Sequence, residues 1–154
     1  MSNDNYKILN LDSDPLVLEC ENKDAIDKFF KGNPDFINRN ISVVIPEGVT
    51  KIRGCAFLDC SSLKSITFPE SVTKIGEEAF YGCSSLTSVT IPDGVTEIGK
   101  GVFDDCSSLK SITIPYGVTE IGGWAFDGCS SLKSITIPYG VTEIGDCAFY
   151  GCSS

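Results

Sequence analysis

The chain contains the stretch Ile114-Pro-Tyr-Gly-Val-Thr-Glu-Ile-Gly-Gly-Trp-Ala-Phe-Asp-Gly-Cys-Ser-Ser-Leu-Lys-Ser-Ile-Thr136, and this 23-residue unit recurs along most of the sequence. Further copies begin at Ile45, Phe68, Ile91 and Ile137. The copies that begin at Ile91 and Ile114 are identical at 18 of 23 positions, which fixes the register of the repeat. A short fixed period of this kind predicts a solenoid, in which each unit covers its neighbour and adds a slab of core.

Each repeat is predicted as a coil of strand, turn, short strand and helical turn. Residues Leu109 to Ile114 alternate apolar and polar side chains and predict a strand, which Leu132 to Ile137 repeats. Pro115 ends the strand, and Ile-Pro-x-Gly predicts a type I turn with proline second and glycine fourth. Val118 to Ile121 predicts a second extended piece. Trp124 to Gly128 is too short for a regular helix and predicts one helical or 3₁₀ turn.

The extended motif Leu-x-x-Ile-x-Ile-Pro-x-x-Val-x-x-Ile-Gly-x-x-Ala-Phe-x-x-Cys resembles the BspA-like class of leucine-rich repeats. The resemblance covers residues 41–154 and recurs in every copy. It implies a curved solenoid with a short-stranded parallel sheet on its concave side. It also implies a non-catalytic protein-interaction or adhesion module, of the kind found on bacterial and protist cell surfaces.

Two regions follow from this reading. Residues 1–40 differ from the repeats and are predicted as an α/β cap over the N-terminal end of the stack, which a solenoid requires. Residues 41–154 are predicted as the array, which consists of a half repeat, four full repeats from 45 and a partial fifth from 137.

Within the predicted cap, two strands are expected at Tyr6 to Leu11 and Leu16 to Cys20. The intervening Asp12-Ser-Asp-Pro15 reads as a turn, because the glycine and glutamate that would follow in a calcium loop are missing. Asn22 is expected to cap an amphipathic helix that ends at Gly32. The predicted apolar face of this helix consists of Ala25, Ile26, Phe29 and Phe30.

Composition excludes several classes of partner. The formal net charge is −9, and an acidic surface repels phosphate backbones, so nucleic-acid binding is not expected. No run of 18 apolar residues occurs, so no membrane span is expected. The start at Met1 lacks the basic and apolar regions of a secretory signal. The N-terminal sequence and the expected free cysteines favour an intracellular location. If a signal was removed, a cell-surface or secreted location is expected.

The eight cysteines do not predict a disulfide scaffold. Five of them share one repeat position and form a predicted column, namely Cys60, Cys83, Cys106, Cys129 and Cys152. Stacked strands are about 4.7–4.9 Å apart, whereas a disulfide needs Cβ atoms roughly 3.5–4.5 Å apart. Cys55 and Cys147 share another position but lie four repeats apart. Without histidine or a Cys-x₂-Cys pair, zinc is not expected. We therefore expect free thiols, no metal and no cofactor.

Function is predicted to lie in binding. The sequence has no histidine, no glycine-rich phosphate loop and no nucleophile beside a base, so no enzyme is predicted. Outward strand positions scarcely vary, whereas the turn after proline and neighbouring outward positions do. The residues expected to contact a protein partner are Tyr116, Tyr139, Trp124, Asp93, Glu70, Glu97 and Glu120. Exposed tyrosine and tryptophan are favoured interface anchors. Neutral drift at tolerant loop positions would produce the same pattern.

Two other roles are compatible with the sequence. The chain would be a structural stacking segment, or a truncated or idealised repeat scaffold, if its uncapped last repeat exposed Phe149, Cys152 and the sheet edge at 132–137. That arrangement predicts end-to-end self-association. The repeated Ser-x-Thr columns also resemble the hydroxyl arrays of ice-binding solenoids. Such arrays need a flat surface, and Lys64 and Lys110 intrude beside them.

Overall fold

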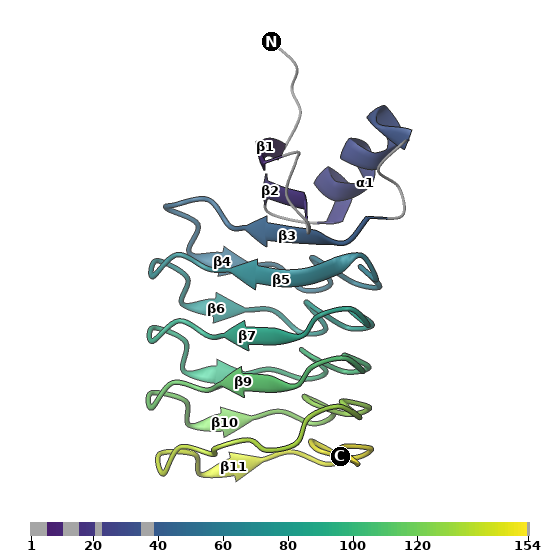
Figure 1. Cartoon of the computed structure of the whole chain (residues 1–154). Helices are drawn as coiled ribbons and strands as arrows, with labels where there is room; N and C mark the ends of the chain where they lie inside the picture. The colour runs from purple at the N-terminus through teal and green to yellow at the C-terminus, as the bar shows by residue number, and fades with distance from the viewer. Residues whose placement is uncertain (1–5, 11–15, 21–22, 35–38, 154) are drawn as a thin grey trace.

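The coils of the chain stack into one column, with a front sheet, a back row of short strands and turns between them (Figure 1). This computed structural model describes residues 6–10, 16–20, 23–34 and 39–153. The predicted turn at Asp12–Pro15 and the predicted cap at Asn22 lie outside the described residues, as do the side chains of Cys20 and Phe30.

The front sheet has six strands in the order β1-β2-β3-β5-β7-β9. β1 and β2 are antiparallel, and every later neighbour is parallel. Equivalent residues of successive repeats pair, so that Ser65 lies opposite Ser42 and Ser88. The bounds are Tyr6–Asn10 for β1, Leu16–Cys20 for β2, Ile41–Val44 for β3, Leu63–Thr67 for β5, Ser88–Thr90 for β7 and Ser111–Thr113 for β9.

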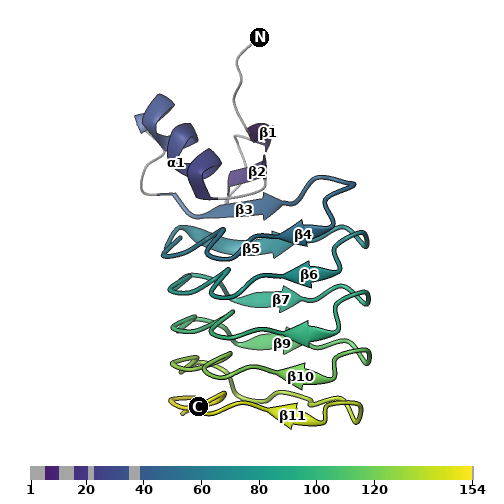
Figure 2. The ribbon, with the colours of Figure 1, turned by 180° about the vertical axis from the view of Figure 1, so that it is seen from behind.

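The back of the column carries two groups of two-residue strands (Figure 2). β4 pairs with β6, and β10 pairs with both β8 and β11, all in parallel. The bounds are Lys51–Ile52 for β4, Lys74–Ile75 for β6, Glu97–Ile98 for β8, Glu120–Ile121 for β10 and Glu143–Ile144 for β11. Glycine directly follows β6, β8, β10 and β11, whereas Arg53 stands between β4 and Gly54.

The helix α1, Lys23–Gly32, covers the N-terminal end of the column (Figure 1). Ala25, Ile26 and Phe29 are buried in the same core as the repeats, which confirms the predicted apolar face at these positions. The helix ends at Gly32, as predicted. The side-chain amide of Asn33 donates a 2.9 Å hydrogen bond to the carbonyl of Phe29 and satisfies one free acceptor there.

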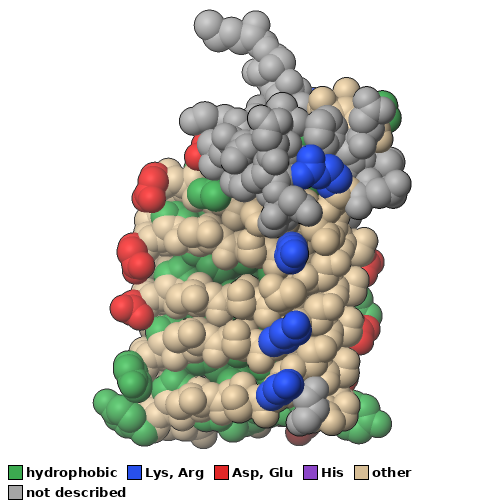
Figure 3. All heavy atoms as spheres, viewed as in Figure 1, with side chains coloured by type: hydrophobic (Ala, Val, Ile, Leu, Met, Phe, Trp, Pro, Cys, Tyr) green, Lys and Arg blue, Asp and Glu red, His purple; other side chains and the backbone are tan. Residues whose placement is uncertain are grey.

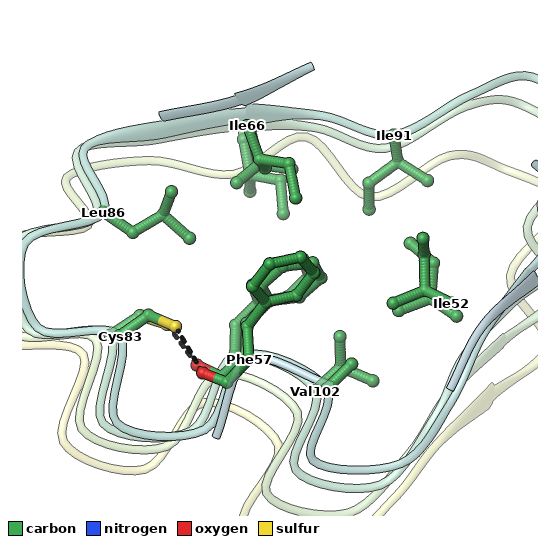
Figure 4. Packing of buried hydrophobic residues seen from close by; sticks show 14 of the residues in the cluster. Ile52, Phe57, Ile66, Cys83, Leu86, Ile91 and Val102 are labelled. Atoms are coloured by element: carbon green, nitrogen blue, oxygen red, sulfur yellow. Dashed lines mark hydrogen bonds between the residues drawn. The ribbon is translucent and has the colours of Figure 1, made fainter. Parts of the chain in front are cut away.

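A ladder of phenylalanine rings runs through the centre of the column. The ring centroids of Phe57 and Phe80 are 5.3 Å apart, and the next three steps, through Phe103 and Phe126 to Phe149, are 5.5, 5.6 and 5.4 Å. Figure 4 looks along this ladder and shows aliphatic side chains from both faces of the coil around the rings. Because each ring packs on its neighbours above and below, the core is continuous from repeat to repeat.

The segment predicted as a helical turn has a different conformation. Its backbone donors alternate between partners: Ala125 donates within the coil to Gly122 at 3.3 Å, and Phe126 donates to Ala148 of the next coil at 2.8 Å. Trp124 and Gly128 adopt left-handed φ angles of 55° and 64°, which a regular helix does not contain. The segment is therefore an irregular coil that hydrogen-bonds to its neighbours in the stack.

Two further expectations are wrong in detail. The hydrogen-bonded turn runs from Pro115 to Val118, whose amide donates to the proline carbonyl at 3.1 Å, so proline is its first residue. The segment 132–137, predicted as a strand, is not one, and β9 is the last strand of the front sheet within the described residues. Its identical counterpart at 109–114 contributes β9, so the sequence of the segment does not by itself decide whether a strand forms.

Candidate interaction edge

The turn after each front strand brings one variable residue of every repeat to the same edge of the column. We call this set the acidic–aromatic edge, and it consists of Glu47, Glu70, Asp93, Tyr116 and Tyr139. Each is the first central residue of a Pro-x-x-Val turn, so its side chain leaves the coil at a corner. Successive turns are in contact, because a Cβ added to Gly140 would lie 3.3 Å from the carbonyl oxygen of Tyr116.

The two tyrosines of this edge form an exposed aromatic pair. Tyr116 is 79% exposed and Tyr139 is 93% exposed, while their ring centroids are only 6.2 Å apart with an interplanar angle of 38°. Figure 3 shows acidic side chains along this edge in the upper coils and hydrophobic ones in the lower coils. Large aromatic side chains held side by side in solvent offer apolar area that a partner can bury.

The other predicted contact residues lie elsewhere on the column. Glu97 and Glu120 are paired on β8 and β10 at the back, where the parallel register places Glu143 next in line. Trp124 follows the far end of β10 and is 41% exposed, and the Nζ of Lys100 lies 5.2 Å from the centroid of its ring. The structure therefore places Glu70, Asp93 and the two tyrosines along one edge. Trp124, Glu97 and Glu120 lie on other parts of the column.

A hollow of about 430 Å³ opens on the front of the column beside the acidic–aromatic edge. Its lining is Ile66, Thr67, Phe68, Glu70, Thr90, Ile91, Pro92 and Asp93. Phe68 is half-buried and stands where the other copies carry isoleucine, and its ring packs edge-on against Phe80 at 5.9 Å. Sequence reasoning missed this hollow, although the departure of Phe68 from the repeat was a visible signal.

The front sheet presents hydroxyl columns between the acidic–aromatic edge and a row of basic side chains. Thr67, Thr90 and Thr113 are exposed on successive strands in parallel register. The hydroxyls of Ser42 and Ser65 hydrogen-bond to each other at 2.6 Å. Figure 3 shows a row of Lys and Arg side chains along the other side of this face. The front face is therefore acidic on one side and basic on the other.

The cysteine column lies in the core, and its thiols are hydrogen-bond donors. Cys106 donates from Sγ to the carbonyl of Phe80 at 3.2 Å, and Cys83 and Cys129 bond to the preceding coil in the same way. Figure 4 shows this bond for Cys83. Burial raises the pKa of Cys106 well above its ordinary value and that of Cys129 to about 12. No disulfide links the cysteines that the structure describes.

Alkylation should therefore distinguish two kinds of cysteine. Cys55 and Cys147 are exposed, and we expect iodoacetamide to label both in the native protein at pH 7.5, because water reaches their sulfur atoms. Cys83 and Cys106 should react only after denaturation, since a buried thiol does not ionise. Peptide mapping by mass spectrometry measures each site separately. Equal labelling of Cys106 and Cys55 in the native state would contradict the buried column.

Asp104 is the one acidic side chain in the described structure for which a large pKa shift is found. Partial burial raises its pKa to about 6, and the neighbouring carboxylates of Asp105, Asp127 and Glu78 add to the effect. The folded state therefore holds a proton on Asp104 more tightly than the unfolded chain, in which the ordinary value is 3.8. Stability should consequently rise as the pH falls through 6 towards 4.

The variant Asp104→Asn tests this pH dependence. At pH 7.5 it should raise stability by on the order of 1 kcal/mol, a figure discounted for solvent screening of a partly exposed group. The gain should shrink at pH 5, because wild-type Asp104 is then mostly protonated. Melting curves of both proteins at the two pH values measure the difference, with Asp93→Asn on the exposed edge as the control. An unchanged gain at pH 5 would contradict the raised pKa.

Across the described segments, no group of three or more acidic or cysteine side chains is arranged to hold a metal ion. None of the described helices is long and apolar enough to cross a bilayer.

The stacked parallel strands, the phenylalanine ladder and the repeat motif define a leucine-rich repeat solenoid. The chain matches the BspA type leucine-rich repeat region in six copies over residues 32–154, and it belongs to this family. No curated protein matches the sequence significantly.

Solved structures of bacterial leucine-rich repeat proteins share the fold. A T. pallidum leucine-rich repeat protein is 31% identical, with a TM-score of 0.72 over 99% of this chain and 67% of its own. One from Bacteroides ovatus is 44% identical, with a TM-score of 0.67 over 70% of this chain and 30% of its own. A leucine-rich cell surface protein from Faecalibacterium prausnitzii is 28% identical, with a TM-score of 0.57 over 99% and 52%. The chain thus spans 30% to 67% of their lengths.

Proposed function

We propose that this chain is a non-catalytic protein-binding module whose acidic–aromatic edge contacts the partner. The observation that carries the proposal is the pair Tyr116 and Tyr139, held 6.2 Å apart and almost fully exposed. The repeat frame is nearly constant, and this edge is one of the places where its copies differ in charge and aromatic character. A constant frame whose edge varies from coil to coil is suited to binding a particular protein surface.

The proposal extends to adhesion at a cell surface. Its support is the similarity to the Faecalibacterium prausnitzii protein, which is described as a leucine-rich cell surface protein. Membership of the BspA type family also supports a role in adhesion. Immunolabelling of intact cells of the source organism tests the location, and labelling that needs permeabilised cells would contradict it.

Paired affinity capture tests the binding role of the edge. The double variant Tyr116→Ser, Tyr139→Ser should lose a partner that the wild type retains, with affinity lowered tenfold or more, about the effect of losing a hot spot. Tyr150→Ser is the matched control, because Tyr150 is 70% exposed but lies at another repeat position. The melting temperature should change little in both. Equal capture by the wild type and the double variant would contradict the proposal.

A second proposal concerns self-association, which the last described coil favours. Ile144 on β11 is 54% exposed, whereas its counterpart Ile121 on β10 is fully buried. Ile137 is 36% exposed at the same end, where its counterpart Ile114 is 8% exposed. We propose that a second copy of this chain covers the coil, with two β11 edges meeting about a two-fold axis.

Light scattering at increasing concentration tests the self-association. The wild type should approach the mass of two chains, and Ile144→Lys should remain at one, because a lysine at the contact would have to be desolvated. Glu97→Gln on β8 is the control and should behave as the wild type. A one-chain mass for the wild type at all concentrations would contradict this second proposal.

A further inference from the structure

We infer that the hollow beside Glu70 and Asp93 receives an arginine side chain of the partner protein. This inference rests on the proposed binding function and names the chemistry that one part of the edge recognises. The hollow measures about 430 Å³ and lies between two successive coils, so it is a defined pocket for one side chain within a larger contact.

The floor and the rim of the hollow differ in chemistry. Ile66, Ile91 and Pro92 are buried and present an apolar floor, to which half-buried Phe68 adds part of an aromatic ring. Glu70 and Asp93 are exposed at the rim, on turns of successive coils. An apolar floor beneath two carboxylates matches a side chain with an aliphatic stem and a cationic head.

Arginine fits this combination better than other side chains. Its guanidinium is planar and weakly hydrated, so it can stack on an aromatic ring while it donates hydrogen bonds to carboxylates. No lysine or arginine lines the hollow, so the two rim carboxylates face it without a cationic residue among the lining. The negative charge of the chain, −9 overall, also repels an acidic occupant.

Phe68, which departs from the repeat, is one of the residues that line the hollow. The other copies carry isoleucine there, and Ile91 and Ile114 are 2% and 8% exposed. Phe68 instead packs edge-on against Phe80 and is left half-buried beside the hollow. The coil with this aromatic residue is also the coil that carries Glu70, so the aromatic and acidic contacts coincide at one place on the column.

Titration by NMR spectroscopy tests the inference on the intact chain. The probe is the capped peptide N-acetyl-Gly-Arg-Gly-amide, added to isotope-labelled protein. The matched control replaces arginine by citrulline, which has the same shape without the charge. We expect the arginine peptide to shift the amide signals of Thr67, Phe68, Thr90 and Ile91, and these shifts should weaken with salt. Equal shifts with citrulline, or no shifts at these residues, would overturn the inference.

Variants identify the groups responsible. Glu70→Gln and Asp93→Asn should each raise the dissociation constant about two- to fivefold, the size expected for solvent-exposed ion pairs. Glu47→Gln is the control, because Glu47 belongs to the same edge but does not line the hollow. Phe68→Ile restores the common repeat residue and should weaken binding while the fold is kept, as the amide spectrum will show. Unchanged affinity in the variant lacking both carboxylates would overturn the inference.

The arginine-binding inference and the proposed protein-binding function can be contradicted separately. If the arginine peptide does not bind but the tyrosine variant still loses a captured protein, the edge binds a partner through other chemistry. If neither effect is seen, the proposed binding function itself is contradicted.

Discussion

Replacing Phe103 by alanine is expected to lower the free energy of unfolding by about 3 to 5 kcal/mol, the range for a fully buried aromatic side chain. Phe103 is fully buried, and its ring stacks on Phe80 at 5.5 Å and on Phe126 at 5.6 Å. Removing it interrupts the ladder in the middle of the column, where two coil-to-coil contacts are lost together. Denaturant unfolding followed by circular dichroism measures the effect.

Phe149→Ala is the matched control for this prediction. Phe149 stacks on one described ring only, Phe126 at 5.4 Å, and it is partly exposed in the last described coil. Its removal should therefore cost less than half as much as the removal of Phe103. Equal losses for the two variants would mean that the ladder does not couple the coils.

Gly122→Ala is expected to destabilise the protein by about 3 kcal/mol, because it forces two coils apart. A Cβ at Gly122 would lie 2.7 Å from the carbonyl carbon of Gly99 and 2.7 Å from the amide nitrogen of Lys100. Both atoms belong to the backbone of the preceding coil, so no side-chain rotation relieves the overlap. Thermal and denaturant unfolding measure the loss.

Gly99→Ala provides a control at the same repeat position. There the nearest atom to an added Cβ is the Cγ2 of Val102 at 3.7 Å, which is ordinary van der Waals contact. This variant should change stability by less than about 1 kcal/mol. If Gly99→Ala and Gly122→Ala were equally harmful, the cost would come from backbone conformation common to the position, not from the close approach of the coils.

The repeat pattern was sufficient to predict the solenoid and its inward-facing residues. A period of 23 residues fixes which side chains stack, and the apolar positions of the repeat are those found in the core, such as Phe103 and Ile121. The strands β1 and β2 and the helix α1 also follow from local patterns, because each has a clear apolar periodicity bounded by polar or glycine residues.

Two features could not be predicted because they depend on neighbouring coils. The sequence Leu-Lys-Ser-Ile-Thr-Ile occurs at 109–114 and again at 132–137, yet only the first copy contributes a strand. The same six residues therefore contribute to a strand in one coil and not in the next, so their local sequence does not decide the outcome. Likewise, Trp124 takes a left-handed φ of 55° at a position where Gly101 and Glu78 do the same. Nothing in tryptophan or glutamate signals this conformation, which costs roughly 1 kcal/mol or more and is imposed by the stack.

The sequence indicated exposed positions, and whether they bind a partner stays a prediction. The variable turn positions indicated Tyr116 and Tyr139, and the structure places them in contact on one exposed edge. Trp124 and Glu120 vary in the same way along the sequence, but they lie on other sides of the coil. Variation between copies identifies exposed positions without telling which of them share a face, because the path of the coil between them has to be known.

Site-specific photo-crosslinking tests most directly whether the acidic–aromatic edge binds a protein. A photoreactive phenylalanine analogue replaces Tyr139, whose 93% exposure makes the change harmless to the fold. The same analogue at Ser84, an exposed residue away from the edge, is the control. We expect a covalent product with a single protein partner from position 139 and none from position 84. Equal products from both positions, or none from position 139 when a partner is captured, would contradict this expectation.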